Sequence, residues 1–134
     1  MKTLLVPACT SNLGKILSFI EEYLKNVNCS SKIISGINIA AEEIFVNICN
    51  YAYEGIEDVC VQIEFIASLN EIEIRFIDRG KPFNPLQIQE PDVTLSDEQR
   101  EVGGLGIYLV KKLTDGVSYE YNDQQNILTF KKLL

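Results

Sequence analysis

Two stretches near the start of the chain carry apolar residues at helical spacing. They span residues 10–24 and 30–55, and each begins with serine or threonine, which are favourable helix N-caps. We therefore predict two amphipathic helices, preceded by a short strand over residues 2–7 that ends at Pro7. The predicted core stripe of the second helix comprises Ile33, Ile37, Ala41, Ile44 and Ile48.

Beyond these helices the apolar pattern changes to the period of a strand. Residues 59–65 and 72–76 alternate apolar and polar side chains, which predicts an antiparallel hairpin with one solvated face. A third helix is predicted over residues 105–114, followed by two strands over 117–121 and 127–131. This order of elements predicts an α+β fold, a two-layer sandwich whose helices cover one face of a mostly antiparallel sheet.

Residues 84–102 have little periodicity and contain two prolines and several acidic residues. Loops longer than about 12–15 residues inside a compact domain are usually lids or binding loops. We therefore predict a lid over residues 84–102. A short helix over residues 95–101 is the alternative, and it is compatible with a lid.

The bulk composition narrows the class of protein. A chain of 134 residues is predicted to form a single domain over residues 1–134 with its own core. The net charge of −7 argues against nucleic acid as the main partner. No stretch approaches the roughly 20 apolar residues that span a bilayer, and the start does not resemble a signal peptide. The four cysteines lack CxxC spacing, so a reduced, cytoplasmic protein is expected.

The chain contains no histidine. This absence excludes Ser-His-Asp and Cys-His nucleophilic systems, histidine-ligated zinc and a phosphohistidine acceptor within the chain. Any acid–base catalysis must therefore use carboxylates, lysines or tyrosines.

Glu43, Asn47 and Asn50 lie close together on the second predicted helix. At about 100° per residue they fall within a sector of about 60° beside the apolar stripe. Mg²⁺ prefers oxygen ligands, so the functional interpretation assigns the ion to the Asn47 side chain. Glu43 then serves as the general base. The alternative is a solvated helix flank, for which the neighbouring Glu42 is an example.

Asp78 ends a predicted strand and is followed by the sequence Arg-Gly-Lys-Pro-Phe. A carboxylate in this position can accept a hydrogen bond from the exocyclic amine of a purine. In that interpretation Gly80 lets the ring approach the backbone, and Pro82 and Phe83 form a wall of the site. An aspartate closely followed by glycine is also a common turn signal, so both interpretations stay open.

Gly103-Gly104-Leu105-Gly106 precedes the third predicted helix, where free N–H groups and the positive end of the helix dipole converge. A Rossmann fingerprint would need a strand directly before the glycines, and a Walker loop would need Gly-Lys-Ser/Thr. Neither pattern is present. A phosphate clamp at the hinge of the lid is the functional interpretation, and a glycine-rich helix start without a ligand is the alternative.

The order of these motifs resembles the ATP-binding domains of the gyrase and histidine-kinase type. Within that superfamily the chain is most similar to the bacterial anti-sigma-factor serine kinases of the stress and sporulation type. The resemblance covers essentially the whole chain. It is carried by residues 41–54, 78–85 and 103–110.

That resemblance implies a Bergerat ATP-binding fold with specific roles for these residues. Glu43 is expected to be the catalytic base, and Asn47 the Mg²⁺ ligand. Asp78 and Gly80 are expected at the adenine, and the loop from Gly103 to Gly106 at the phosphates. The resemblance also implies that Thr129, on the last predicted strand, supports the adenine site through its hydroxyl.

The resemblance further implies an ATP- and Mg²⁺-dependent protein-serine kinase that acts as an anti-sigma factor. The expected phosphate acceptor is a serine on a STAS-type antagonist, the expected client is a sigma factor, and such kinases are commonly homodimers. Two other functions stay open. One is a nucleotide-gated binding module that phosphorylates nothing, and the other is a stand-alone ATPase domain.

Two residues depart from the family pattern. Tyr51 stands where members often have histidine, and Val102 stands where several carry arginine. Arg100 or Lys111 is then expected to contact the γ-phosphate in place of the missing arginine. Charge stabilisation carries much of phosphoryl-transfer catalysis, so without such a contact ATP binding is expected to survive while transfer slows.

Overall fold

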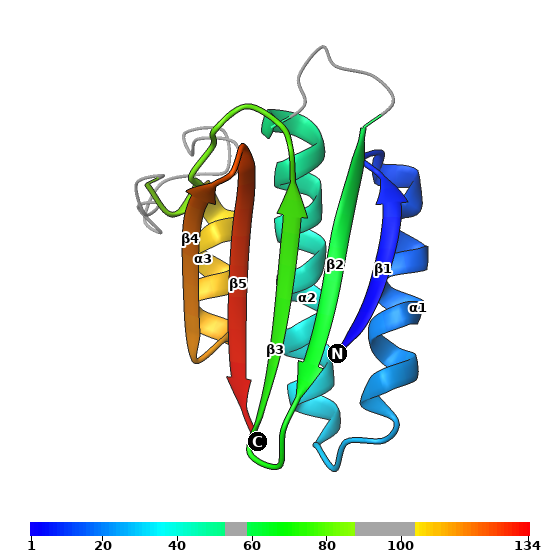
Figure 1. Cartoon of the computed structure of the whole chain (residues 1–134). Coiled ribbons are helices and arrows are strands. Elements are labelled where there is room, and N and C mark those ends of the chain that lie inside the picture. Colours follow the sequence, from blue (N-terminus) through cyan, green and yellow to red (C-terminus); the bar gives the residue numbers. More distant parts are fainter. Residues whose placement is uncertain (53–58, 88–103) are drawn as a thin grey trace.

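A five-stranded sheet with helices on one face forms the part of the chain that the computed structural model describes, residues 1–52, 59–87 and 104–134 (Figure 1). The strands lie in the order β1-β2-β3-β5-β4, and every neighbouring pair is antiparallel. Their bounds are β1 Lys2–Pro7, β2 Cys60–Ala67, β3 Glu71–Asp78, β4 Gly116–Asn122 and β5 Gln125–Leu133. This arrangement confirms the predicted α+β two-layer sandwich.

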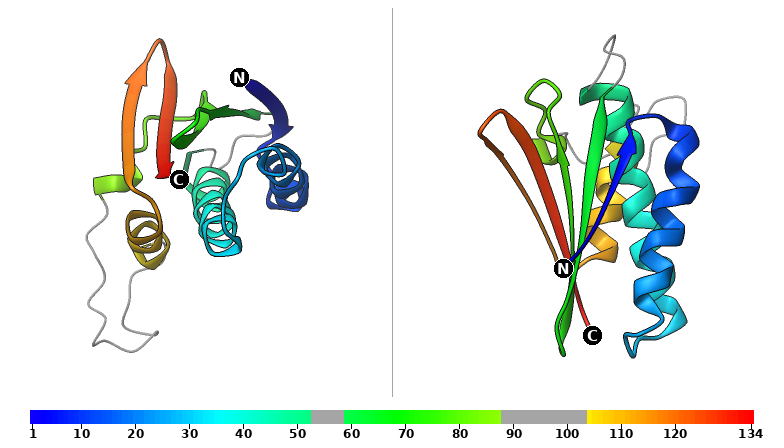
Figure 2. Two further views of the ribbon diagram at one scale, coloured as in Figure 1. Left: turned by 90° about the horizontal axis from the view of Figure 1, so that it is seen from below. Right: turned by 45° about the vertical axis from the view of Figure 1, so that its right-hand side comes forward.

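The helices α1 (Leu13–Leu24), α2 (Ser31–Asn47) and α3 (Gly104–Leu113) form the second layer, with α2 between the other two (Figure 2). Ser30 caps α2, because its Oγ accepts the N–H of Ile33 at 3.2 Å. The first helix begins at Leu13, after a 3₁₀ turn, slightly later than predicted. The second ends at Asn47 and continues as a π-helical turn over Ile48–Ala52, and the rest of its predicted span lies outside the described residues.

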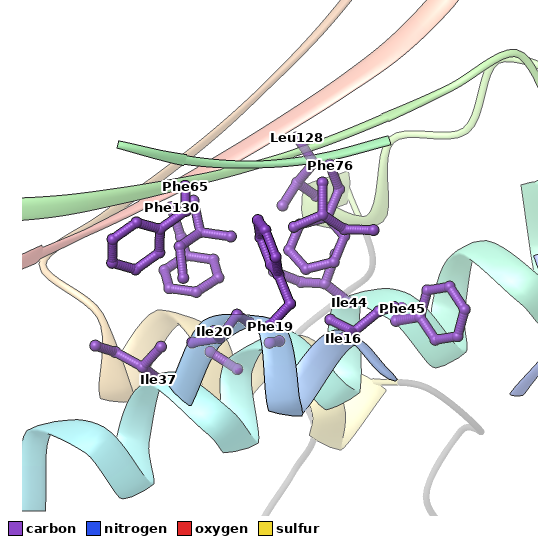
Figure 3. Packing of buried hydrophobic residues seen from close by; sticks show 14 of the residues in the cluster. Ile16, Phe19, Ile20, Ile37, Ile44, Phe45, Phe65, Phe76, Leu128 and Phe130 are labelled. Carbon is purple, nitrogen blue, oxygen red and sulfur yellow. The ribbon is translucent and has the colours of Figure 1, made fainter. Parts of the chain in front are cut away.

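The core lies between the two layers and follows the predicted periodicities (Figure 3). Alternate residues of the strands point toward the helices and meet the apolar stripes of α1 and α2. Burying a large apolar side chain stabilises the fold by about 1.5–3 kcal/mol, so this interface holds the layers together. The buried side chains labelled there are Ile16, Phe19, Ile20, Ile37, Ile44, Phe45, Phe65, Phe76, Leu128 and Phe130.

The other face of the β2–β3 hairpin is polar, as the alternation predicts. Arg75 lies between Glu64 and Glu73, at 3.2 Å from a carboxylate oxygen of each. Glu64 is only 7% exposed, and it also accepts a hydrogen bond from Gln62 at 3.0 Å. The buried charge is therefore paired and hydrogen-bonded, which is the condition under which such a charge is tolerated.

The C-terminal ends of β3 and α2 lie at the same end of the molecule (Figure 1). β5 pairs with β3 so that Asn126 faces Asp78, which is the last residue of β3. Of the predicted lid, the structure describes residues 84–87, with a 3₁₀ turn over Pro85–Gln87. Residues 88–102 and the alternative helix over 95–101 lie outside the described part. Among the described helices none is long and apolar enough to cross a bilayer.

Candidate functional site

Asp78 is buried at the end of β3, with 3% of its surface exposed. Its Oδ1 accepts hydrogen bonds from the backbone N–H of Gly80 and from Nδ2 of Asn126, each at 2.9 Å. Neither bond uses the second carboxylate oxygen, Oδ2. Burial raises the pKa of Asp78 above its ordinary value, and the bonds from Asn126 and Gly80 offset part of that rise.

Asp78 lines a pocket between β3, β5 and the end of α2. Its walls are mostly apolar and a few polar groups converge in it, but its free volume is only about 10 Å³, so a purine ring can enter only when the walls move apart. The lining residues are Ile44, Asn47, Ile48, Asp78, Phe83, Pro85, Tyr119, Asn126 and Leu128.

The aromatic wall of this pocket involves a residue that departs from the family pattern. Phe83 stacks on Tyr51, with ring centroids 5.4 Å apart and an interplanar angle of 25°. Pro82 was expected in the wall, but it is exposed and does not line the pocket. The buried Pro85 takes that place, because the 3₁₀ turn after Phe83 folds it inward.

Asn47, the last residue of α2, lines the same pocket and is 5% exposed. Within the described residues its Nδ2 is buried without a hydrogen-bond partner. Buried polar groups normally have partners, so this amide is suited to a polar ligand. A half-turn of the amide would present its oxygen instead, which is the atom that Mg²⁺ prefers.

Glu43 lies one helical turn before Asn47 and meets the start of α3. A Cβ built on Gly106 would overlap Glu43 Oε2 and lie 3.2 Å from Glu43 Cδ. A side chain at position 106 would therefore force the end of the Glu43 side chain to move away from α3. Burial raises the pKa of Glu43, and the negative charge of Glu42 raises it further. The structure thus brings together two residues that are 63 positions apart (106 − 43).

Thr129 does not lie beside Asp78. Thr129 pairs with Arg75, and it alternates with the buried Leu128 and Phe130, so its side chain points to the open face of the sheet. The role that the resemblance implied for Thr129, support of the adenine site through its hydroxyl, does not fit this position, because Thr129 does not line the pocket at Asp78. Asn126 contacts Asp78 instead, because the register of β5 places it directly opposite.

Lys111 lies in the last turn of α3, seven residues after Gly104 (111 − 104). At 1.5 Å per residue this separates it by about 10 Å along the helix from the glycine-containing first turn. The expected contact of Lys111 with the γ-phosphate therefore stays a prediction, and it would need the lysine side chain to extend along α3 toward that first turn. Arg100, Val102 and Gly103 lie outside the described residues, as does the side chain of Leu105.

Asn126 and Tyr119 are site residues that the sequence interpretation missed. Asn126 is 4% exposed and lies in the buried series of β5 with Leu128 and Phe130. A polar residue at an inward position of an alternating strand was the available signal. Tyr119 of β4 contributes its hydroxyl to Asn126, which a pattern within one strand does not reveal.

Comparison with known proteins relates this arrangement to nucleotide-binding domains. The sequence model of the family described as "Histidine kinase-like ATPase domain" matches residues 6–132. The chain is 28% identical over 106 residues to the serine-protein kinase RsbW of Listeria monocytogenes serovar 1/2a, covering 76% of this chain and 68% of the relative. It is 29% identical over 134 residues to RsbW of Bacillus pumilus, covering 96% and 83%.

Solved structures of other proteins share the fold. A solved structure of RsbU and RsbW domains from Mycobacterium tuberculosis superposes with a TM-score of 0.62 at 15% identity. The match covers 99% of this chain and 33% of that chain, so this chain spans about a third of the length of the solved chain. At this identity the likeness shows the fold alone.

Proposed function

Given that this chain belongs to the histidine kinase-like ATPase domain family, we propose that it is an ATP- and Mg²⁺-dependent protein-serine kinase. In this proposal it acts as an anti-sigma factor in partner-switching control of transcription. The phosphate acceptor is a serine on a STAS-type antagonist, the released client is a sigma factor, and the kinase acts as a cytoplasmic homodimer. The similarity to serine-protein kinases supports the reaction class.

The observation that supports this function most strongly is the placement of three polar side chains at one end of the molecule. Asp78 lies in the pocket, Asn47 lines the same pocket from α2, and Glu43 lies one turn earlier against Gly106. A purine read by Asp78 would direct its phosphates toward α3. The γ-phosphate would then lie within reach of Glu43.

Each side chain has a distinct task in the proposed reaction. Asp78 accepts a hydrogen bond from the adenine amine, and Asn47 offers its side-chain oxygen to Mg²⁺. When bound, Mg²⁺ supplies charge neutralisation at the phosphates. Glu43 accepts the proton of the attacking serine hydroxyl, and its raised pKa makes it a better proton acceptor than an ordinary glutamate.

Calorimetric titration with a non-hydrolysable ATP analogue, with and without Mg²⁺, tests the nucleotide site. We expect binding that Mg²⁺ strengthens. Incubation with ATP and a panel of STAS-domain proteins from the same organism then tests transfer, with mass spectrometry to locate phosphoserine. Absence of binding at millimolar nucleotide would contradict the proposal.

A binding module that holds its partner only with ATP bound is the second candidate, and it is favoured by Val102, which stands where several family members carry arginine. Such a module would capture the partner without transferring phosphate. The same mass-spectrometric assay separates the two functions, because only the kinase leaves a phosphoserine on the partner.

Gly106→Ala is expected to slow phosphoryl transfer by about 10²-fold, because the new Cβ displaces the Glu43 carboxylate from its position. Single-turnover transfer rates measure this effect. Gly14→Ala is the matched control: it also lies in the first turn of a helix, and a Cβ there meets nothing within 4 Å. Equal transfer rates in the two variants would show that Gly106 does not make room for Glu43.

A further inference from the structure

Asn126 is the centre of the hydrogen-bond network behind Asp78. Its Nδ2 donates to Asp78 Oδ1 at 2.9 Å and to the backbone carbonyls of Lys81 at 2.9 Å and Gly80 at 3.3 Å. Its Oδ1 accepts the N–H of Phe83 at 3.1 Å. One amide thus joins the carboxylate of β3 to the turn that follows it.

The partners of Asn126 determine which way its amide points. Three oxygen atoms surround one end, so that end must carry the donors. The backbone N–H of Phe83 meets the other end, so that end must be the acceptor. Tyr119 also reaches this oxygen through its hydroxyl, which must therefore donate. The chain Tyr119 to Asn126 to Asp78 consequently has a single direction of hydrogen bonding.

We propose that Asn126, oriented by Tyr119, is the positioning residue that sets purine selectivity at Asp78. This inference rests on the proposed ATP site. Asn126 and the N–H of Gly80 both bind Oδ1, so the proposal gives Oδ2 the role of acceptor for a ligand in the pocket that Asp78 lines. An acceptor at this point pairs with the 6-amino group of adenine and opposes the 6-oxo group of hypoxanthine, which is also an acceptor.

The selectivity depends on Asp78 being ionised. A protonated Asp78 could donate to a 6-oxo group, and the preference for an amine would then fall. Asn126 stabilises the ionised form through its N–H. Among the described groups, Tyr119 faces Asp78 within the pocket, and Arg79 and Cys60 border it from a second hollow.

The test compares ATP and inosine triphosphate binding by calorimetry in wild type, Asn126→Asp and Tyr119→Phe. Asn126→Asp keeps the shape but replaces the donor by an oxygen facing three acceptors. We expect ATP affinity at pH 8 to fall by about tenfold or more, and the ratio of ATP to inosine triphosphate affinity to fall with it. Tyr119→Phe should also lower the ATP affinity and the ratio of ATP to inosine triphosphate affinity, each by a smaller factor of about threefold to tenfold.

A pH series provides the readout that a purely structural role would not change. Amine recognition requires ionised Asp78, so wild-type ATP affinity is lost as the pH falls through the raised pKa of Asp78. Asn126→Asp removes a donor and adds a like charge, which raises that pKa further. The loss of ATP affinity should therefore begin at a higher pH in this variant.

Ser118→Ala is the control, because Ser118 is exposed on the opposite face of β4 beside Tyr119. It should leave affinity, selectivity and pH profile unchanged. An unchanged nucleotide ratio and pH profile in a folded Asn126→Asp variant would overturn the inference alone. If that variant does not fold, an unchanged ratio in Tyr119→Phe would do so. Absence of ATP binding by the wild type would overturn the proposed function and the inference together.

Discussion

Glu43→Ala is expected to reduce phosphoryl transfer by about 10²–10⁴-fold while ATP affinity stays within about threefold of wild type. The carboxylate lies against Gly106 at the start of α3, and it does not line the purine pocket. Its removal therefore takes away the proton acceptor without removing a contact to the base. Single-turnover transfer and calorimetric titration measure the two quantities separately.

The exposed Glu42 provides the matched control for Glu43. Glu42→Gln should keep transfer near the wild-type rate at pH 8. A general base must be ionised, so wild-type transfer is lost as the pH falls through the raised pKa of Glu43. Glu42 contributes to that rise, so its neutralisation should move the loss to lower pH. A transfer rate in Glu43→Ala equal to wild type would exclude Glu43 as the base.

Asp78→Asn is expected to weaken ATP binding by about 10- to 100-fold while the protein stays folded. The N–H of Gly80 and Nδ2 of Asn126 both donate to the Oδ1 position. They will keep the oxygen of the new amide there and turn its NH₂ toward the ligand. That NH₂ would face the adenine amine, which also donates, so neither group could be satisfied.

The same geometry predicts that Asp78→Asn changes the preference between ATP and inosine triphosphate, in addition to weakening ATP binding. The NH₂ that Asp78→Asn introduces can donate to a 6-oxo group, so inosine triphosphate should lose less affinity than ATP, or gain. Titration with both nucleotides measures this, and Asp123→Asn in the exposed β4–β5 turn is the control. Equal losses of ATP affinity in Asp78→Asn and Glu43→Ala would contradict the separate roles of the two carboxylates.

Periodicity sufficed to predict the layers because each element buries a regular face. The alternation of β2 and β3 marked the residues that point toward the helices, and Ser30 marked the start of α2 through its own hydroxyl. These are interactions between residues close in sequence. The predicted ends of elements were less accurate, as in α1, where a 3₁₀ turn precedes Leu13.

Part of the site could also be read from single motifs. The N–H of Gly80 donates a hydrogen bond to Asp78, and Glu43 and Asn47 lie one turn apart on the same helix. Motif spacing therefore sufficed to name these residues as candidates. Their roles toward ATP and Mg²⁺ stay predictions that the variants above test.

By itself, then, the sequence determined the two-layer α+β fold, the positions of the polar residues on their elements and the family to which the chain belongs. The tertiary structure alone decided which residues meet. The pairing of β3 with β5 puts Asn126 rather than Thr129 beside Asp78. Successive side chains of β5 point to opposite faces of the sheet, so Asn126 and Thr129, three positions apart, lie on different faces. The packing of α2 on α3 puts Glu43 against Gly106. Such contacts depend on strand register and helix packing between distant segments, and local periodicity carries no information about either.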